Sequence, residues 1–154
     1  MANGERLLAD SNRHKEPAAL LLCDLDHFKR LNDSFGHPMG DQALIAFSRI
    51  LAENLRKQDV FGRIGGEEFA CLLKEAGEQE AVQVAERIRQ SFSQLSMLEP
   101  GMLSVSIGVV TTRESGYDLF GLLSQADEAL YGAKDRGRNR VQTLRKMYLS
   151  LTDN

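Results

Sequence analysis

The stretch AALLLCDLDHFK, residues 18–29, decides the fold class of this 154-residue chain. Six consecutive apolar residues, 18–23, follow Pro17, and such a short uninterrupted run predicts a β-strand that is buried on both faces. Two aspartates, Asp24 and Asp26, stand where that strand ends. A carboxylate in this position costs free energy unless it is paired, solvated or bound to a metal ion, so Asp24 is a candidate site residue.

Outward from this strand, the chain interleaves helices and strands. Apolar residues at helical spacing predict helices over residues 5–15, 26–35, 40–56, 78–95, 118–135 and 144–151. Short runs of apolar and β-branched residues predict strands over residues 60–64, 69–73 and 103–110, with Val141 in a last short strand. The Gly65-Gly66 pair between the first two of these runs predicts a β-hairpin. The order favours an α+β fold, an antiparallel sheet with helices packed on one side, over a doubly wound parallel sheet.

Composition excludes several classes of protein. The chain has 19 Lys and Arg residues against 22 Asp and Glu, a net charge of −3, and is 42% hydrophobic. It is therefore neither disordered nor a general binder of nucleic-acid polymers or anionic membranes. No run of about 18 apolar residues predicts a membrane span, and the first residues do not resemble a signal peptide. We expect a cytoplasmic protein in which Cys23 and Cys71 are reduced and buried.

The hairpin carries two adjacent carboxylates, Glu67 and Glu68, after the glycine pair. If the hairpin pairs beside the first strand, one of the two converges with Asp24; otherwise they form an ordinary solvated hairpin tip. Hard oxygen ligands from two strands suit Mg²⁺ or Mn²⁺, which usually act together with substrate phosphates.

Further polar residues allow two interpretations each. Lys134 and Arg138 either complement a helix dipole or hold phosphate oxygens. Asn32 and Asp41 either recognise a guanine edge, or end one helix and cap the next. We expect Asp26 to cap the helix that follows the first strand.

Taken in order, these motifs resemble the GGDEF family of diguanylate cyclases. The matching stretches are DLDHFK (24–29), ND (32–33), FGH (35–37), GD (40–41), RIGGEEF (63–69), SVSIG (104–108), AD (126–127), ALY (129–131), AK (133–134) and GRN (137–139). The resemblance covers about residues 5–142. It implies a ferredoxin-like fold, the palm of nucleotide cyclases and polymerases: an antiparallel sheet with flanking helices. It also implies a reaction, the condensation of two GTP to cyclic di-GMP and pyrophosphate.

The resemblance also implies roles for individual residues. Glu67 stands in the GGEEF variant of the signature, as the catalytic carboxylate. Asp24, the backbone carbonyl of Leu25 and Glu67 would hold Mg²⁺ (or Mn²⁺), with Glu68 able to assist. The GTP-binding residues implied by the motifs are Phe28, Lys29, Asn32, His37, Asp41, Gly65, Gly66, Lys134 and Arg138. Because one domain holds one GTP, the active form is expected to be a two-fold homodimer, which can be transient.

A second site is implied outside the catalytic centre. RKQD, residues 56–59, matches the RxxD inhibitory motif of the family, and Arg87 matches its additional arginine. Arg56, Asp59 and Arg87 are therefore expected to bind the product, cyclic di-GMP, and to give feedback inhibition. The alternative is a helix end with a solvated Asp59.

The chain departs from the family pattern at its start. The usual Asp-x-Leu-Thr-x-Leu-x-Asn-Arg opening is absent, so we expect a single bacterial domain over residues 1–154 without that opening, and with a tail at 143–154. This departure puts the catalytic rate in doubt. It keeps an alternative open: a catalytically weak regulatory module that binds cyclic di-GMP or GTP.

Overall fold

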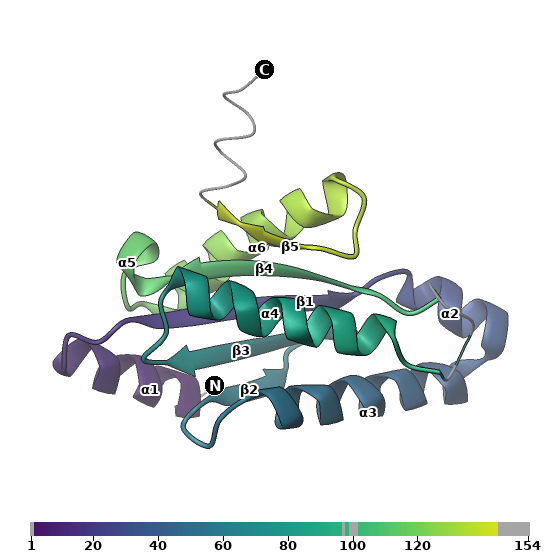
Figure 1. Cartoon of the computed structure of the whole chain (residues 1–154), viewed down its shortest axis with the longest axis horizontal. Coiled ribbons are helices and arrows are strands. Elements are labelled where there is room, and N and C mark those ends of the chain that lie inside the picture. The colour runs from purple at the N-terminus through teal and green to yellow at the C-terminus, as the bar shows by residue number, and fades with distance from the viewer. Residues whose placement is uncertain (1, 97, 99–101, 145–154) are drawn as a thin grey trace.

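The computed structural model describes residues 2–96, 98 and 102–144. Within them, five strands form one sheet in the order β2-β3-β1-β4-β5, and helices cover it (Figure 1). The elements are α1 (Ala2–Arg13), β1 (Ala18–Leu25), α2 (Phe28–Phe35), α3 (His37–Asn54), β2 (Val60–Arg63), β3 (Glu68–Lys74), α4 (Glu78–Ser93), β4 (Val105–Thr111), α5 (Thr112–Ser115), α6 (Leu119–Asp135) and β5 (Val141–Thr143). The mixed α+β architecture is as predicted.

The central strand β1 is buried along its whole length, as its apolar sequence predicts. It pairs antiparallel with β3 on one side and with β4 on the other. The predicted hairpin is present as β2 and β3, which also pair antiparallel. The sheet is not wholly antiparallel, because the edge strand β5 runs parallel to β4.

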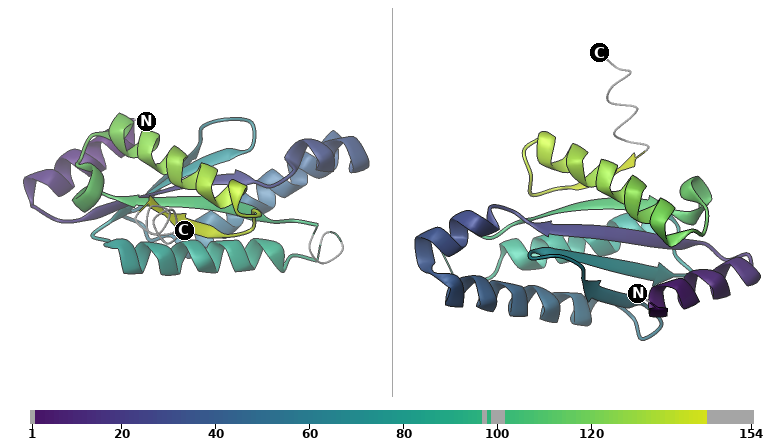
Figure 2. Two further views of the ribbon diagram at one scale, coloured as in Figure 1. Left: turned by 90° about the horizontal axis from the view of Figure 1, so that it is seen from above. Right: turned by 180° about the vertical axis from the view of Figure 1, so that it is seen from behind.

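Helices cover both faces of the sheet, so the prediction that they pack on one side is wrong (Figure 2). One face of β1 packs against α3 and α4, where Phe47 lies 5.1 Å from both Phe69 and Phe92 between ring centroids. The other face packs against α1 and α6. A strand that is apolar at every position needs cover on both sides, and two pairs of helices supply it.

Helix α6 lies unusually close to the sheet. A Cβ at Gly108 of β4 would come within 2.4 Å of the backbone oxygen of Ala126 and 2.5 Å of the backbone nitrogen of Leu130. Only glycine permits this approach of two backbones. Asp118 fixes the start of α6, where its Oδ2 accepts a 2.9 Å hydrogen bond from the Gly121 amide. These two contacts set where the far end of α6, with Lys134, meets the sheet.

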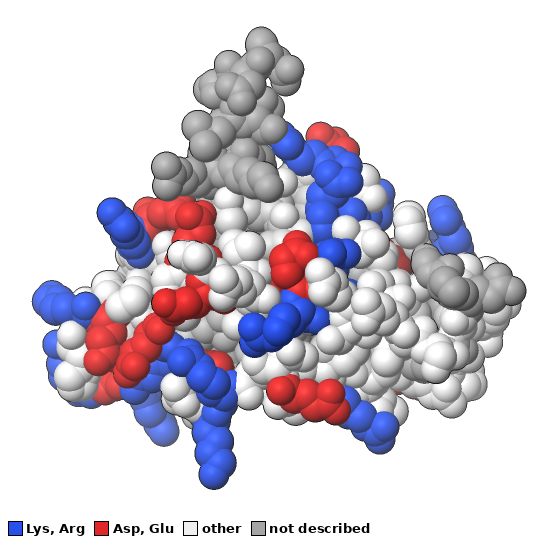
Figure 3. All heavy atoms as spheres, viewed as in Figure 1, with Lys and Arg blue, Asp and Glu red and all other residues white. Residues whose placement is uncertain are grey.

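Several smaller expectations can be compared with the structure. Cys23 and Cys71 are free and buried, as predicted. Residues 145–154, most of the expected C-terminal helix, lie outside the described residues. No helix in the described ranges is long and apolar enough to cross a membrane. On the face that carries α4, cationic and anionic side chains are interspersed, in keeping with the small net charge (Figure 3).

Candidate active site

Asp24 sits at the end of β1, where three separate motifs meet. In the β1–β3 register its Cα partner is Glu68 of the GGEEF hairpin, so the two residues lie on the same face of the sheet. From α6, the Lys134 Nζ forms a 2.6 Å ion pair with Asp24 Oδ2. Asp24 is 6% exposed, so this charge is neutralised in a largely dry environment. The structure therefore brings together one of the two hairpin glutamates and one of the two predicted cations.

The charge balance at this point is negative. Burial raises the pKa of Glu68 above its ordinary value of 4.5, and the nearby Asp24 carboxylate raises it further. Lys134 opposes this rise, whereas Asp127 and Glu67 add to it. A single lysine faces more than one carboxylate, and such a site favours an additional cation.

The hairpin tip is shaped by hydrogen bonds to its backbone. The Glu68 carbonyl accepts bonds from the amides of Ile64 (2.9 Å) and Gly65 (3.4 Å), which closes the turn. The Arg63 guanidinium donates to the carbonyls of Gly65 (3.0 Å) and Gly66 (2.6 Å). Arg63 had no expected role from its sequence alone, although its position just before the glycine pair puts its side chain within reach of their carbonyls.

Glu67 is half-buried and precedes β3 by one residue. Its carbonyl accepts a 3.1 Å hydrogen bond from the Leu25 amide, which extends the pairing of β1 with the hairpin by one step. The backbone of Glu67 is thereby fixed beside the residue that follows Asp24.

The turn between α2 and α3 holds Asn32 against Gly40. A Cβ at Gly40 would lie 1.8 Å from Asn32 Oδ1 and 3.2 Å from the Phe28 ring, so glycine is required for the two helices to meet. Asn32 Oδ1 is buried and has no hydrogen-bond partner among the residues that the structure describes. A buried amide oxygen without a hydrogen-bond partner is unusual, and a base-recognising side chain would present such an atom before its ligand arrives.

The capping alternatives for Asn32 and Asp41 are wrong. Asn32 lies inside α2, which runs to Phe35, and α3 begins at His37, so Asp41 is an exposed residue within that helix. His37 and Lys29 are exposed at the same end of the molecule. These side chains remain available to a ligand, because helix termination does not occupy them.

The expectation that Asp26 caps α2 is wrong. The N-cap position is His27, which has a left-handed backbone (φ 54°) and makes no side-chain cap. Asp26 turns instead toward β4, where it accepts hydrogen bonds from the hydroxyls of Ser104 (2.7 Å) and Ser106 (2.6 Å). Its Oδ2 also accepts a 3.0 Å bond from the Asn139 amide. The alternation Ser104-Val105-Ser106 was the signal for this contact, because it places both hydroxyls on one face of a strand.

The turn between α6 and β5 carries the second predicted cation. Arg138 is exposed, and three consecutive residues here have positive φ: Gly137 (117°), Arg138 (64°) and Asn139 (46°). The structure thus separates the two cations: Lys134 binds Asp24, and Arg138 projects from a left-handed turn that Asp26 contacts.

The carboxylates of Asp24 and Glu68 are a pair of hard oxygen donors that could bind a divalent cation. Among the described residues, no group of three or more His, Cys, Asp or Glu side chains is arranged to hold a metal ion. Asp24 and Glu68 nevertheless lie opposite each other in the strand register, Lys134 pairs with Asp24, and both carboxylates offer oxygen ligands. Two carboxylates are the usual protein contribution to a Mg²⁺ site that is completed by substrate phosphates and water.

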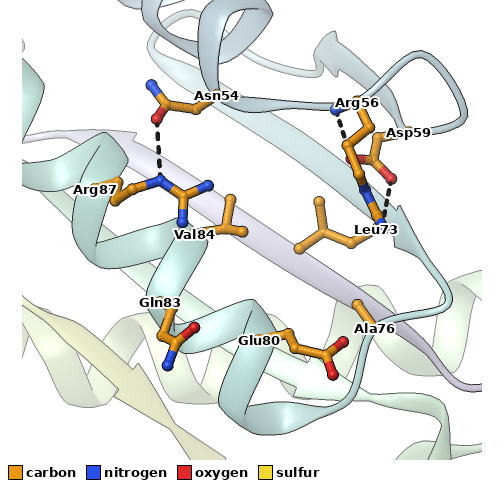
Figure 4. Close-up of a pocket in the computed structure, with 9 residues that line it drawn as sticks. All are labelled: Asn54, Arg56, Asp59, Leu73, Ala76, Glu80, Gln83, Val84 and Arg87. Carbon is orange, nitrogen blue, oxygen red and sulfur yellow. Dashed lines mark hydrogen bonds and ion pairs between the residues drawn. The ribbon is translucent and has the colours of Figure 1, made fainter.

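A separate pocket of about 280 Å³ brings together Arg56, Asp59 and Arg87 (Figure 4). Arg56 and Asp59 belong to the turn after α3, and Arg87 projects from α4 on the other side of the pocket. Asn54 lies beside Arg87, whose Nε donates to the Asn54 Oδ1 at 3.4 Å. The three residues of the predicted second site therefore share one cavity.

The Asp59 side chain mainly binds backbone amides and so fixes the wall of this pocket. Its side chain is 2% exposed, and it accepts hydrogen bonds from the amides of Arg56 (2.8 Å) and Lys74 (3.0 Å). The Arg56 guanidinium also contacts Asp59 (Nη2 to Oδ1, 3.2 Å) and the Lys74 carbonyl. Asp59 thus closes the turn, so the exposed cations of the pocket are Arg56 and Arg87.

Comparisons with known proteins agree on one family. The family described as "Diguanylate cyclase, GGDEF domain" matches residues 3–140. The chain is 41% identical over 143 residues to diguanylate cyclase DosC of Escherichia coli (strain K12), and 37% identical over 142 residues to the probable diguanylate cyclase DgcT of the same organism. These matches cover 90% and 89% of this chain but 31% of each relative, so the chain spans about a third of their length.

Solved structures show the same fold. The active GGEEF domain of a diguanylate cyclase from Vibrio cholerae superposes with a TM-score of 0.87 at 31% identity, and covers 93% of this chain and 92% of that one. The GGDEF domain of DgcB from Caulobacter crescentus, solved in complex with c-di-GMP, gives a TM-score of 0.83 at 28% identity over 93% of this chain and 84% of that one.

Proposed function

This chain belongs to the GGDEF-domain family of diguanylate cyclases, and from that premise we propose that it condenses two molecules of GTP into cyclic di-GMP. The 3′-oxygen of each GTP forms a bond to the α-phosphorus of the other. The bond between that phosphorus and the oxygen bridging to the β-phosphate breaks, and pyrophosphate leaves. Two such steps close the ring and release two pyrophosphates.

One observation carries the proposal: the convergence of Asp24, Glu68 and Lys134 at one end of the sheet. These residues come from the first strand, the hairpin and the last long helix, and no packing requirement of the core demands charges there. Phosphoryl transfer needs this combination, carboxylates for a metal ion and cations for phosphate oxygens, within one site.

The metal-binding part of the proposal assigns oxygen ligands. Asp24, the Leu25 carbonyl and Glu67 would hold Mg²⁺ or Mn²⁺, and Glu68, which lies opposite Asp24 in the strand register, would assist. When bound, the metal ion lowers the pKa of the 3′-hydroxyl and stabilises the charge of the leaving pyrophosphate. Glu67 accepts the proton of the 3′-hydroxyl as general base.

Substrate binding falls to the residues around these carboxylates. Asn32, with its unpartnered buried oxygen, and Asp41 recognise the guanine edge, with His37 nearby and Phe28 beside them. Lys29, Lys134 and Arg138 hold phosphate oxygens; Lys134, paired with Asp24 in the free chain, gains a second anionic partner when GTP binds. Gly65 and Gly66, both exposed, let the nucleotide lie over the hairpin.

Each domain presents one GTP, and each GTP attacks the other, so the active form is a homodimer with a two-fold axis between the sites. The dimer can be transient. Cyclic di-GMP binds the pocket of Arg56, Asp59 and Arg87 and inhibits the reaction, because two exposed arginines suit its phosphates and guanine edges.

The experiment is to incubate the purified chain, stripped of bound nucleotide, with GTP and Mg²⁺ and to separate the nucleotides by chromatography. Accumulation of cyclic di-GMP, and its absence when EDTA replaces Mg²⁺, is the expected result. Hydrolysis of GTP without a dinucleotide product would contradict the proposal.

A second candidate is a regulatory module that binds cyclic di-GMP or GTP with little turnover. The cavity of Arg56 and Arg87 favours it, since that cavity lies apart from the catalytic carboxylates and needs none of them. Calorimetry with cyclic di-GMP and with GTP separates the candidates: binding of either nucleotide by a chain that makes no product supports the module.

A further inference from the structure

Three segments of the chain meet at the carboxylate of Asp26, which no catalytic role so far employs. Oδ1 accepts from the Ser106 hydroxyl at 2.6 Å, and Oδ2 accepts from the Ser104 hydroxyl at 2.7 Å and the Asn139 amide at 3.0 Å. The residue is 8% exposed. Both oxygens are thus occupied by the protein, and Asp26 is not placed to bind substrate itself.

The segment that Asp26 holds is conformationally unfavourable. Gly137, Arg138 and Asn139 follow one another with φ of 117°, 64° and 46°. Non-glycine residues rarely adopt this left-handed region, and two in succession persist only where the surroundings impose it. A carboxylate that accepts the Asn139 amide favours such a turn, because a charge-assisted bond is stronger than a neutral one.

Other contacts fix the turn on both sides of Arg138. The amides of Gly137 and Arg138 donate to the carbonyls of Lys134 (3.2 Å) and Ala133 (3.0 Å), which joins the turn to the end of α6. On the far side, Arg89 of α4 donates to the Asn139 Oδ1 at 3.1 Å. Asp26 is therefore a direct link between this turn and the strand end that carries Asp24, in addition to the link through Lys134.

We infer that Asp26 is a positioning residue for phosphate binding: by holding the Asn139 amide it fixes the left-handed turn, and with it Arg138, relative to Asp24 and Lys134. This inference rests on the proposed function, in which Arg138 holds the phosphates of GTP. Asp26 acts through the turn and touches neither substrate nor metal ion.

The test is a double-mutant cycle of Asp26→Ala and Arg138→Ala, with KM for GTP and kcat measured separately. Each single variant is expected to raise KM about tenfold, the typical effect of losing a charge-assisted contact, and the double variant to raise it no further. If the two increases in KM multiplied in the double variant, the inference would be overturned. A lower kcat at unchanged KM for Asp26→Ala would also overturn it, because a merely structural Asp26 would reduce only the fraction of active protein.

Two further variants serve as controls. Asp26→Asn keeps the size and can accept from Asn139 and Ser104 while donating to the Ser106 hydroxyl, so KM is expected to stay within about threefold of the parent chain. Glu5→Gln removes the same charge from the exposed part of α1 and is expected to change nothing. An Asp26→Asn variant as impaired as Asp26→Ala would contradict the geometric role.

A readout without turnover keeps the inference distinct from the proposed function. Amide hydrogen exchange of Asn139, followed by NMR in the nucleotide-free chain, is expected to speed up at least about tenfold in Asp26→Ala and several-fold in Asp26→Asn. The second variant serves if the first does not fold. Unchanged exchange would refute the positioning role of Asp26, even if the chain is an active cyclase. Faster exchange in a chain that makes no cyclic di-GMP would support that positioning role and refute the proposed function alone.

Discussion

Two aspartates are paired with cations at opposite ends of the β1–β3 ladder, and they are paired in different ways. Asp24 lies at the Glu68 end of the register, and its partner Lys134 is 110 residues away in the sequence. Asp59 binds the amide of Lys74, which is paired with Ala18 at the other end, and its partner Arg56 is three residues away. One pair depends on the whole sheet, and the other on a single turn.

The difference shows which of the two carboxylates is free to attract a further cation. Asp59 accepts hydrogen bonds from two backbone amides and a guanidinium, so its negative charge is already compensated within the protein. Asp24 shares one lysine with a second carboxylate whose pKa is raised. We therefore expect a cation to be recruited at the Asp24 end and an anion to be recruited, by arginines alone, at the Asp59 end.

The largest effect is expected from Glu67→Gln. Loss of the general base and of a metal ligand should reduce the rate of cyclic di-GMP formation about 10²- to 10⁴-fold, with the fold retained. The measurement is the initial rate together with a circular dichroism melt. Arg56→Ala, at the other end, should stay within about twofold of the parent rate without product, and a normal rate for Glu67→Gln would refute its catalytic role.

Arg56→Ala should act on inhibition instead. We expect the product concentration that halves the initial rate to rise at least about tenfold, because a charge-assisted contact to phosphate or guanine is lost. Arg49→Ala, which removes an exposed arginine from α3, is the matched control and should leave inhibition unchanged. Equal inhibition of both variants would show that the pocket does not bind the product.

Asp59→Ala should mainly lower stability. It leaves the amides of Arg56 and Lys74 without their acceptor, which is expected to cost about 1–3 kcal/mol in the free energy of unfolding. Urea denaturation measures this, and Arg56→Ala should cost less because its side chain is 49% exposed. A larger loss for Arg56→Ala would reverse the assignment of Asp59 to the turn.

Glu68→Gln should give the smallest effect, a pH-dependent gain in stability. Burial and Asp24 raise the pKa of Glu68 above 4.5, so the folded chain binds this proton more tightly than the unfolded chain. The ionised carboxylate therefore disfavours folding above its raised pKa and has no effect below about pH 4, where both states are protonated. Melting temperatures should show Glu68→Gln as the more stable variant at pH 7, and parity at pH 4; a less stable variant at pH 7 would contradict the charge imbalance.

The sequence predicted the elements well because their signals are local. The apolar run of β1, the glycine pair of the hairpin and the helical spacing of α4 and α6 each depend on neighbouring residues. The placement of helices on one side was wrong because it was inferred from the order of elements. Burial of every residue of β1 already demanded cover on both faces.

The site was predictable in its parts but not in its pairings. Asp24 and Lys134 were both candidates, yet only the close approach of α6 at Gly108 brings them into contact. Asp26 was assigned to the nearest helix because capping is a local rule. Its partners Ser104, Ser106 and Asn139 lie 78 to 113 residues further along the chain, beyond the reach of any local pattern.

The long separation between Asp24 and Lys134 has a consequence for the order in which the molecule is made. All the residues that line the arginine pocket lie within residues 54–87, so every one of them is synthesised before α6. At about 5–20 residues per second, the interval between the synthesis of Arg87 and that of Lys134 is roughly 2–9 s. The residues of the proposed inhibitory pocket are therefore all present in the nascent chain several seconds before Lys134, which the proposed catalytic centre requires.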